Sequence, residues 1–450
     1  ITIEERAQLE KAAENMGLEP RRLLRLEQAM LAAYQAHHRV QIIEHYEEPT
    51  ASLSPIQIQA DGDDSKTLLM KQIAQLERRV RELEDELRRL QASIHVEVDL
   101  RELEDSVADA SEDAEEIWRR VRRNPTSAEA LNQLYRVYGA REEHDKCWCI
   151  AQVLVALGQA NQEQRTLFER QRSDTLIVPR GGVSPAAWHD LLFHPEQEAL
   201  TSQIFGLIAP AVLLGRVTSL RRDGKLHLPA PSAKQDPSSA TVTAVRALPW
   251  AAAILGLQCP QIYIEKERDV AFEHIPSIPP LTTIGKRALT GLNQIEHAFL
   301  VGRHMTAYRQ EHYIRVLFAA VPDLEDLFLA ALTIGNPALP IAEERKRRVR
   351  PIADAIAPML EAAQLDALRG CFLRFVEEGG RTNLQRWSLA AEKTGCRAGL
   401  LLCNDLSTAL KRLEMEEGKY GELARDCIAF VTSDRYFKLR RQLGISIDQN

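Results

Sequence analysis

The amino-acid sequence predicts a mainly α-helical protein, in which a helical N-terminal module, a coiled coil and repeat-like helices precede an α+β domain with a small sheet. Three observations carry this prediction: an unbroken heptad pattern, paired amphipathic segments after it, and short apolar runs that give way to long helical periodicity. With 450 residues, the chain has room for about three domains and a large buried core.

The N-terminal segment is expected to form a helical docking module over residues 1–46. Thr2 and Glu5 make a capping box that starts its first helix. Residues 47–66 combine prolines with an acidic run and have no apolar period, which predicts a linker.

A heptad pattern over residues 67–98 predicts a coiled coil. Its a positions are Ile73, Val80, Leu87 and Ile94, and its d positions are Leu69, Leu76, Leu83 and Leu90. β-Branched residues at a with leucine at d favour a parallel dimer. Packing on helices of the same chain is the alternative, but a packing face inside a globular domain is wider than this narrow seam, which favours self-association.

Residues 99–175 are expected to form repeat-like helices. The apolar positions of one helical pair are Leu131, Leu134, Tyr138, Cys147 and Ala151, with a helix break at Gly139-Ala140. This unit resembles a tetratricopeptide repeat, and a partial second unit follows it. A repeat array needs at least about three units to stand alone, so these helices need a neighbour to cover them.

The remaining residues, 183–450, predict the α+β domain. The expected strands are 263–265, 270–272 and 281–284, with helix breaks at 319–323, 335–337 and 379–380. We expect a helix over 191–214 that is interrupted at Pro210, and a surface loop over 228–239. Everything after Thr290 has helical periodicity.

The helix expected over 292–306 follows a short strand, an Ala-Phe turn and a second strand. This order resembles the lead-in to the metal helix of HExxH zinc peptidases, the family that includes the heat-shock membrane protease HtpX and the CAAX prenyl proteases. In that motif two histidines one turn apart bind zinc, and the glutamate between them is the general base. The alignment places Gly302 and Thr306 at the histidine positions and Arg303 at the glutamate position. Glycine offers no ligand, and a guanidinium cannot accept a proton.

A second segment, 387–401, is similar to the downstream helix of the same family, where a glutamate supplies the third zinc ligand. Glu392 stands at that position, while Gly395-Cys396 replaces the usual Ala-Asp pair. One carboxylate without the two histidines does not make a zinc site. The resemblance therefore implies an inactive metallopeptidase-like domain with no metal and no cofactor, in which a salt bridge from Arg303 to Glu392 holds the cleft shut.

Three histidines near the aligned motif are candidates for displaced zinc ligands. His297, His304 and His312 would lie on one face of a straight helix, separated by about 10 Å per step at about 1.5 Å rise per residue, too far to share one zinc ion. We expect hydrogen-bonded histidines in a packing face. A displaced metal site that uses Glu392 with one of them is the alternative.

Residues 308–313 combine aromatic and charged side chains just beyond the aligned motif. They would line the former active-site cleft and form a partner- or ligand-binding surface. The alternative, that these side chains only pack against the rest of the protein, is equally well supported. The predicted partner groove comprises Arg303, His304, Tyr308, Arg309, His312 and Glu392.

Charge, cysteine content and hydropathy limit the classes of function. A net charge of −7 argues against nucleic-acid binding, and the basic run 345–350 is expected to be a solvated face. Seven cysteines without CxxC spacing predict reduced thiols in the cytoplasm. The most apolar runs, 204–214 and 250–257, are shorter than the ~20 residues of a membrane span, and no signal peptide is expected.

Together these features predict a non-catalytic, cytosolic, bacterial-type scaffold or adaptor. It would form a homodimer through the coiled coil and bind protein partners through the repeat-like helices and the groove. One alternative is an unorthodox zinc metallohydrolase that uses Glu392 and a displaced histidine. Another is a regulatory subunit that recognises peptides in the old substrate groove.

Overall fold

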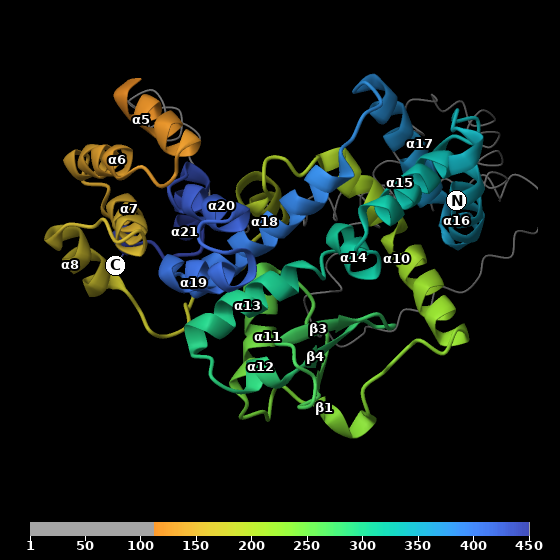
Figure 1. Cartoon of the computed structure of the whole chain (residues 1–450), viewed down its shortest axis with the longest axis horizontal. Coiled ribbons are helices and arrows are strands. Elements are labelled where there is room, and N and C mark those ends of the chain that lie inside the picture. Colours follow the sequence, from red (N-terminus) through yellow and green to blue (C-terminus); the bar gives the residue numbers. More distant parts are fainter. Residues whose placement is uncertain (1–111, 450) are drawn as a thin grey trace, which may run out of the picture. The chain divides into compact units, whose positions relative to one another are not determined.

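The computed structural model describes residues 112–449, and most of this part of the chain is helical (Figure 1). A mainly α architecture with one small mixed sheet is therefore confirmed. The N-terminal module, the linker and the coiled coil, predicted over residues 1–98, lie outside the described residues, as does the start of the repeat-like region. Those predictions are not tested by the structure.

Four helices make up the described part of the repeat-like region: α5 (Glu112–Arg123), α6 (Ala128–Ala140), α7 (His144–Ala156) and α8 (Gln162–Gln171). Ser127 caps α6, and Asn161 forms a capping box with Gln164 at the start of α8. The break after Ala140 matches the expected break between the paired helices.

The C-terminal helices supply the neighbour that this region needs. They are α18 (Leu384–Cys403), α19 (Leu406–Glu417), α20 (Glu422–Val431) and α21 (Asp434–Gln442), followed by the 3₁₀ turn η4 (Ile447–Gln449). Helix α7 packs against α19 and α20, and Trp118 of α5 donates a hydrogen bond to the carbonyl of Thr432 at 3.2 Å. One hydrophobic core runs from Ile117 to Leu443, so the repeat-like helices share their core with the C-terminal helices.

The small sheet consists of β1 (Lys234–Gln235), β2 (Gln261–Ile264), β3 (Phe272–Ile275) and β4 (Leu281–Ile284). Its order is β1-β2-β4-β3; β2 and β4 are parallel and the other pairs are antiparallel. Strand β4 falls where the sequence predicts it. Strand β2 begins two residues before its expected range, and β3 begins at the last residue of its expected range. Strand β1 lies inside the segment expected to be a loop, because its ladder depends on β2, far along the chain.

The prediction of a helix over 191–214 with a break at Pro210 is wrong about both the start of the helix and the break. The chain forms α9 (Pro185–Ala187), the π-helical turn η1 (Trp188–Leu192) and then α10 (Ala199–Arg222), which continues past Pro210. Proline removes one helical hydrogen bond. Buried side chains on both sides of it, Ile204, Ile208 and Val212, hold the helix against its neighbours and outweigh that loss.

Helix α10 is also relevant to the expectation that the chain has no membrane-spanning helix. Among residues 112–449 it is the one helix long and apolar enough to cross a membrane by length and composition, and just over half of its apolar stretch is buried within the protein. The expectation of no membrane span therefore stays a prediction.

The other helices are α11 (Thr243–Leu255), α12 (Lys286–Leu289), α13 (Gln294–Thr306), α14 (Gln310–Leu317), α15 (Val321–Gly335), α16 (Glu343–Ile356) and α17 (Ala362–Glu377), with the 3₁₀ turns η2 (Pro231–Ala233) and η3 (Ala357–Met359). The helix expected over 292–306 is confirmed as α13, which Asn293 and Glu296 start with a capping box. The three expected helix breaks after Thr290 are also present. The basic residues of α16 are exposed, and four of them are paired with acidic neighbours: Arg345, Lys346, Arg348 and Arg350.

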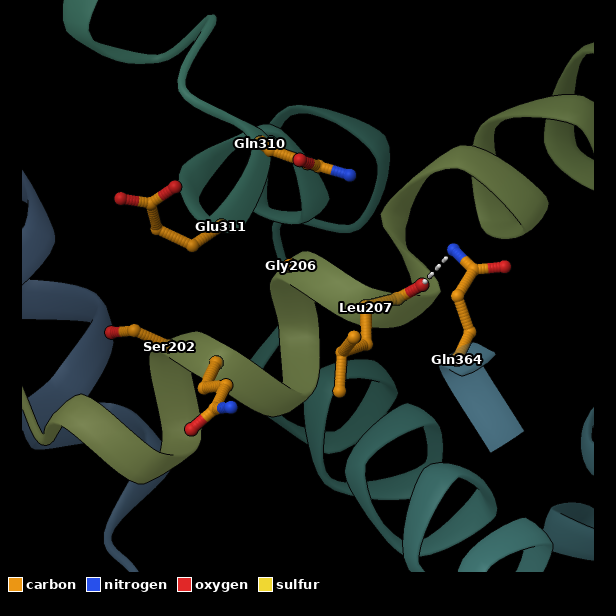
Figure 2. A pocket seen from close by; sticks show the side chains of 7 residues that line it. Ser202, Gly206, Leu207, Gln310, Glu311 and Gln364 are labelled. Atoms are coloured by element: carbon orange, nitrogen blue, oxygen red, sulfur yellow. Dashed lines mark hydrogen bonds between the residues drawn. The ribbon is translucent and has the colours of Figure 1, made fainter. Parts of the chain in front are cut away.

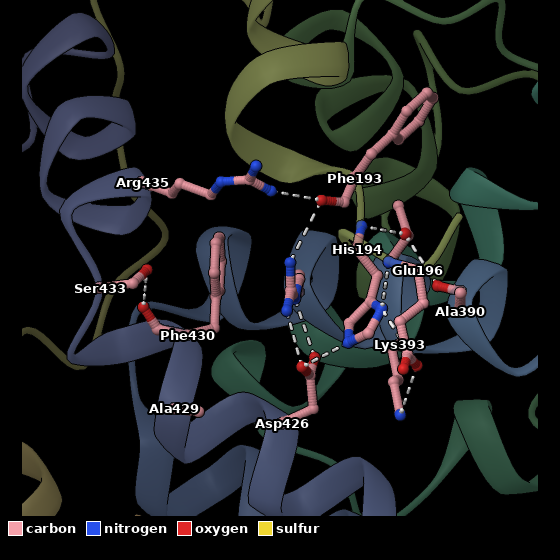
Figure 3. A network of polar contacts seen from close by, with 12 residues as sticks. Phe193, His194, Glu196, Ala390, Lys393, Asp426, Ala429, Phe430, Ser433 and Arg435 are labelled. Atoms are coloured by element: carbon pink, nitrogen blue, oxygen red, sulfur yellow. Dashed lines mark hydrogen bonds and ion pairs between the residues drawn. The ribbon is translucent and has the colours of Figure 1, made fainter. Parts of the chain in front are cut away.

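A buried polar network fixes the segment between η1 and α10 (Figure 3). Arg397 of α18 binds both carboxylate oxygens of Asp426 on α20, at 2.8 and 2.6 Å, and His194 lies 3.2 Å from the same carboxylate. Arg397 and Arg435 both donate to the carbonyl of Phe193. Burial raises the pKa of Asp426, but Arg397 and His194 more than offset it, so this carboxyl has a pKa well below its usual value.

Candidate functional site

The helices that carry the two aligned motifs, α13 and α18, pack side by side at glycines (Figure 1). A β-carbon on Gly302 would lie 2.8 Å from Cα of Gly399, and one on Gly399 would lie 2.5 Å from the carbonyl oxygen of Phe299. Only glycine allows backbones to approach this closely. At the position aligned with the first zinc-binding histidine, the neighbouring backbone therefore fills the space that a side chain would need.

The second aligned position also provides no ligand. Thr306 is buried, and its hydroxyl donates to the carbonyl of Gly302 at 2.9 Å. Within residues 112–449, no group of three or more His, Cys, Asp or Glu side chains is arranged to hold a metal ion. The residues at the aligned positions thus do not fit a zinc ion.

A cavity of about 270 Å³ lies beside this crossing, between β3, α13, α14 and α18. Four of the predicted groove residues line it: Arg303, His304, His312 and Glu392. The lining residues that were not predicted include Phe272, His274 and Arg315. The residues predicted from the resemblance thus include four that line this cavity. The structure shows that strand β3 and the later residues of α14 line it as well.

The predicted salt bridge between Arg303 and Glu392 is confirmed. Nη2 of Arg303 lies 2.9 Å from Oε1 of Glu392. On its other side, Nη1 of Arg303 binds both carboxylate oxygens of Glu416 at 2.8 and 2.6 Å. The guanidinium at the aligned base position is thus held between two carboxylates, a strongly fixed arrangement.

Arg315 brings a second guanidinium to the same carboxylate. Its Nε donates to Oγ of Ser388 at 2.8 Å, and its Nη2 lies 3.4 Å from Oε2 of Glu392. Burial lowers the pKa of Arg315, the Glu392 carboxylate raises it, and the nearby Arg303 lowers it further, for a net decrease. The only sequence signal for Arg315 was its position one turn after His312.

Two predicted groove residues are used elsewhere. Tyr308 does not line the cavity; its hydroxyl contacts Thr282 and donates to the carbonyl of Leu281 at 2.9 Å. Arg309 pairs with Glu311 at 2.7 Å and lies over the rings of Trp188 and Phe193. For these two residues, packing is the reading that the contacts favour.

The three histidines do not lie on one helix, so that expectation is wrong. The chain turns after Thr306 and places His312 on α14. All three are buried with hydrogen-bond partners, as expected for packing residues. His297 contacts the carbonyls of Asn293 and Ala288. His304 contacts the hydroxyl of Thr282. His312 contacts the side chain of Gln197 and the carbonyl of Thr306. These contacts give no support to a displaced metal site, since both ring nitrogens of His297 and of His312, and Nε2 of His304, already have hydrogen-bond partners.

Acid should destabilise the protein through the histidines of the cavity. Burial lowers the pKa of His274 to about 4 and that of His312 to about 4. The unfolded chain, with a histidine pKa of about 6.5, then binds more protons, so stability present above about pH 6.5 is lost as the pH falls to about 4. Each histidine contributes a slope of up to about 1.4 kcal/mol per pH unit. Chemical denaturation at several pH values measures this slope.

A matched pair of variants isolates the effect. His274→Phe keeps an aromatic ring stacked on His304 and removes one titrating group, so it should make the slope between pH 6.5 and 4 shallower. His189→Gln removes an exposed histidine and should leave the slope unchanged. Equal slopes for the native protein and His274→Phe would contradict the assignment.

A second cavity, of about 330 Å³, lies between α10, α14 and α17 (Figure 2). Its polar side chains are Ser202, Gln203, Gln310, Glu311 and Gln364. Gln364 donates to the carbonyl of Leu207 at 3.2 Å, and Glu311 is already paired with Arg309. With neutral amides and an engaged carboxylate, this cavity offers less binding chemistry than the one with two guanidinium groups.

Comparison with known proteins gives no match: no family model, no curated protein and no solved structure is similar to this chain. The cavity beside the glycine crossing combines two half-buried arginine side chains, one carboxylate and neutral imidazoles. It has the groups to bind and orient an anionic partner, and the aligned base position holds no proton acceptor.

Proposed function

We propose that this protein is a non-catalytic scaffold or adaptor whose C-terminal part is an inactive metallopeptidase-like domain. The observation that carries the proposal is the crossing of α13 and α18, where Gly302 packs on Gly399 and Arg303 is paired with Glu392. A zinc peptidase needs ligands and a base at those positions. This chain has a closed helix contact and an ion pair there instead.

The remaining side chains near the cavity also favour binding over catalysis. Both carboxylate oxygens of Glu392 are already engaged, one with Arg303 and the other with Arg315. Cys396 lies close to them, but burial raises its pKa to about 12, so it is a neutral thiol at neutral pH. A binding role requires neither a base nor a thiolate.

An edge strand and the repeat-like helices support protein binding. Strand β3, which contributes Phe272 and His274 to the cavity, pairs only with β4 in the described sheet, and an edge strand can pair with an extended peptide. The repeat-like helices offer a second surface, and the predicted coiled coil would bring two such chains together. Seven free cysteines fit a reducing cytoplasmic location.

Two measurements on the purified full-length chain test the proposal. Elemental analysis should find no stoichiometric zinc, and sedimentation should give about twice the mass of one chain, as expected for a coiled-coil dimer. Replacing two heptad leucines with aspartate (Leu76→Asp with Leu83→Asp) should give monomers. A control with changes at outward heptad positions, Arg78→Gln with Asp85→Asn, should remain dimeric.

The contrary outcomes are equally specific. Stoichiometric zinc that is lost on Glu392→Ala, together with peptide hydrolysis, would establish the metallohydrolase alternative. A native chain that sediments as a monomer at micromolar concentration would remove the self-association part of the proposal.

A further inference from the structure

The cavity beside the glycine crossing contains one carboxylate shared by two guanidinium groups. Glu392 makes a close contact with Arg303, at 2.9 Å, and a long one with Arg315, at 3.4 Å. Charged N–H···O hydrogen bonds usually measure about 2.7–2.9 Å. Arg315 is therefore only weakly paired by Glu392, and Ser388, its other hydrogen-bond partner, is neutral.

The charge balance of the lining points in the same direction. Among the ionised groups that line the cavity, Arg303 and Arg315 are positive and Glu392 is negative. The second carboxylate, Glu416, binds Arg303 from outside the lining and does not contact Arg315. Burial lowers the pKa of Arg315 even with Glu392 present, as expected for a desolvated cation that lacks a close counter-ion.

The rest of the lining is apolar or neutral. Phe272, Leu300 and Ala391 contribute apolar surface, and burial lowers the pKa values of His274 and His312 to about 4, so both rings are uncharged at neutral pH. A volume of about 270 Å³ lies below the usual range for sites of drug-sized ligands, about 300–1,000 Å³. The space therefore suits an anionic group on a short apolar body.

We propose that this cavity binds a carboxylate with a short apolar body, whose anionic group lies between Arg303 and Arg315 and displaces Glu392 from Arg315. Glu392 then acts as an internal competitor for the ligand. Its side chain is 36% exposed, so the displaced carboxylate can move into water without a new burial cost. This inference rests on the proposed function, because it requires a cavity that holds guanidinium groups in place of zinc.

The carboxylate can come from a free small acid or from the C-terminus of a peptide. Isothermal titration calorimetry on the full-length protein, in a buffer without phosphate or carboxylates, distinguishes them with four probes. These are 4-methylpentanoate, its neutral amide, acetylated alanyl-leucine with a free carboxylate, and the same peptide amidated. At least one of the two carboxylate probes should bind, and its amide should bind at least about tenfold more weakly, since a hydrogen bond to a charged group is lost.

Two variants are expected to change affinity in opposite directions. Arg315→Gln should weaken binding about tenfold to a hundredfold, whereas Glu392→Gln should strengthen it about tenfold, because it removes the competing charge. Arg386→Gln, on the same helix as Glu392 but 58% exposed and paired with Glu196, should leave affinity unchanged. Circular dichroism and thermal denaturation verify that each variant is folded.

The inference is overturned if neither carboxylate probe binds, or if acid and amide bind equally well. It is also overturned if folded Glu392→Gln binds the carboxylate no more tightly than the native protein. Binding of the peptide alone identifies a C-terminus as the source, and binding of 4-methylpentanoate identifies a free acid; both support the site. Zinc content and sedimentation are measured on the same samples, so failure of the site and failure of the scaffold proposal give different results.

Discussion

Gly399→Ala is expected to destabilise the protein by about 3 kcal/mol or more, a large share of the ~5–15 kcal/mol that typically stabilises a domain. The new β-carbon would lie 2.5 Å from the carbonyl oxygen of Phe299, and this neighbour is backbone that cannot rotate away. The two helices must therefore move apart along their shared buried face. The free energy of unfolding, measured by chemical denaturation, gives the size of the effect.

The control for this prediction is Gly370→Ala on α17. This glycine is also helical, but no atom lies within 4 Å of its missing β-carbon. Alanine should stabilise the helix there by up to about 1 kcal/mol, because glycine is the poorer helix former. If Gly399→Ala were as stable as Gly370→Ala, the close approach of α13 and α18 would be wrong, and with it the argument that no ligand fits at Gly302.

Asp145→Ala is expected to cost about 3–5 kcal/mol, since it leaves a buried charge without its partner. Asp145 on α7 is 3% exposed and Arg440 on α21 is 1% exposed. The guanidinium of Arg440 donates to both carboxylate oxygens, with the closest contacts at 2.8 and 2.9 Å, and the backbone N–H of Ile447 donates to the same carboxylate at 3.0 Å. Loss of this carboxylate should therefore loosen the repeat-like helices from the C-terminal helices.

Two further variants test whether burial causes this effect. Asp366→Ala removes an exposed partner of Arg369 and should change stability by less than about 1 kcal/mol. The double variant Asp145→Leu with Arg440→Met removes both buried charges and should be more stable than Asp145→Ala alone. A double variant that is less stable than the single one would show that the pair contributes more than mutual neutralisation.

Amide hydrogen exchange provides an independent readout of the same contact. In Asp145→Ala, the amides of α7 and of the segment after α21 should exchange faster than those of α13, which lies elsewhere in the core. Uniform acceleration throughout residues 112–449 would indicate global destabilisation and no specific link between these elements.

Local signals in the sequence predicted the helices well. The helix expected over 292–306 and the break near Gly139 follow from patterns within a few residues, and the structure agrees with both. The pairing of Arg303 with Glu392 was predicted across many intervening residues, because the resemblance assigned both positions to one cleft. The fold of the metallopeptidase-like part and the scaffold function remain proposals.

Other features depended on contacts that no local pattern encodes. Helix α10 continues past Pro210 because side chains on both sides of the proline are buried against other helices. Strand β1 exists only through its pairing with β2. Arg315 enters the cavity because the chain turns after Thr306 and starts a second helix, which also separates His312 from the other two histidines.

The sequence by itself determined the helix breaks after Thr290, because helix-breaking residues and periodicity act within a few residues. It also determined that the aligned motif positions carry a glycine, an arginine and a threonine. Only the tertiary structure decided what occupies that place instead. Two glycines distant in the chain meet backbone to backbone, and two arginines from different helices share one carboxylate. Both arrangements depend on how helices pack in space, and the energy of that packing comes from residues far apart in the chain.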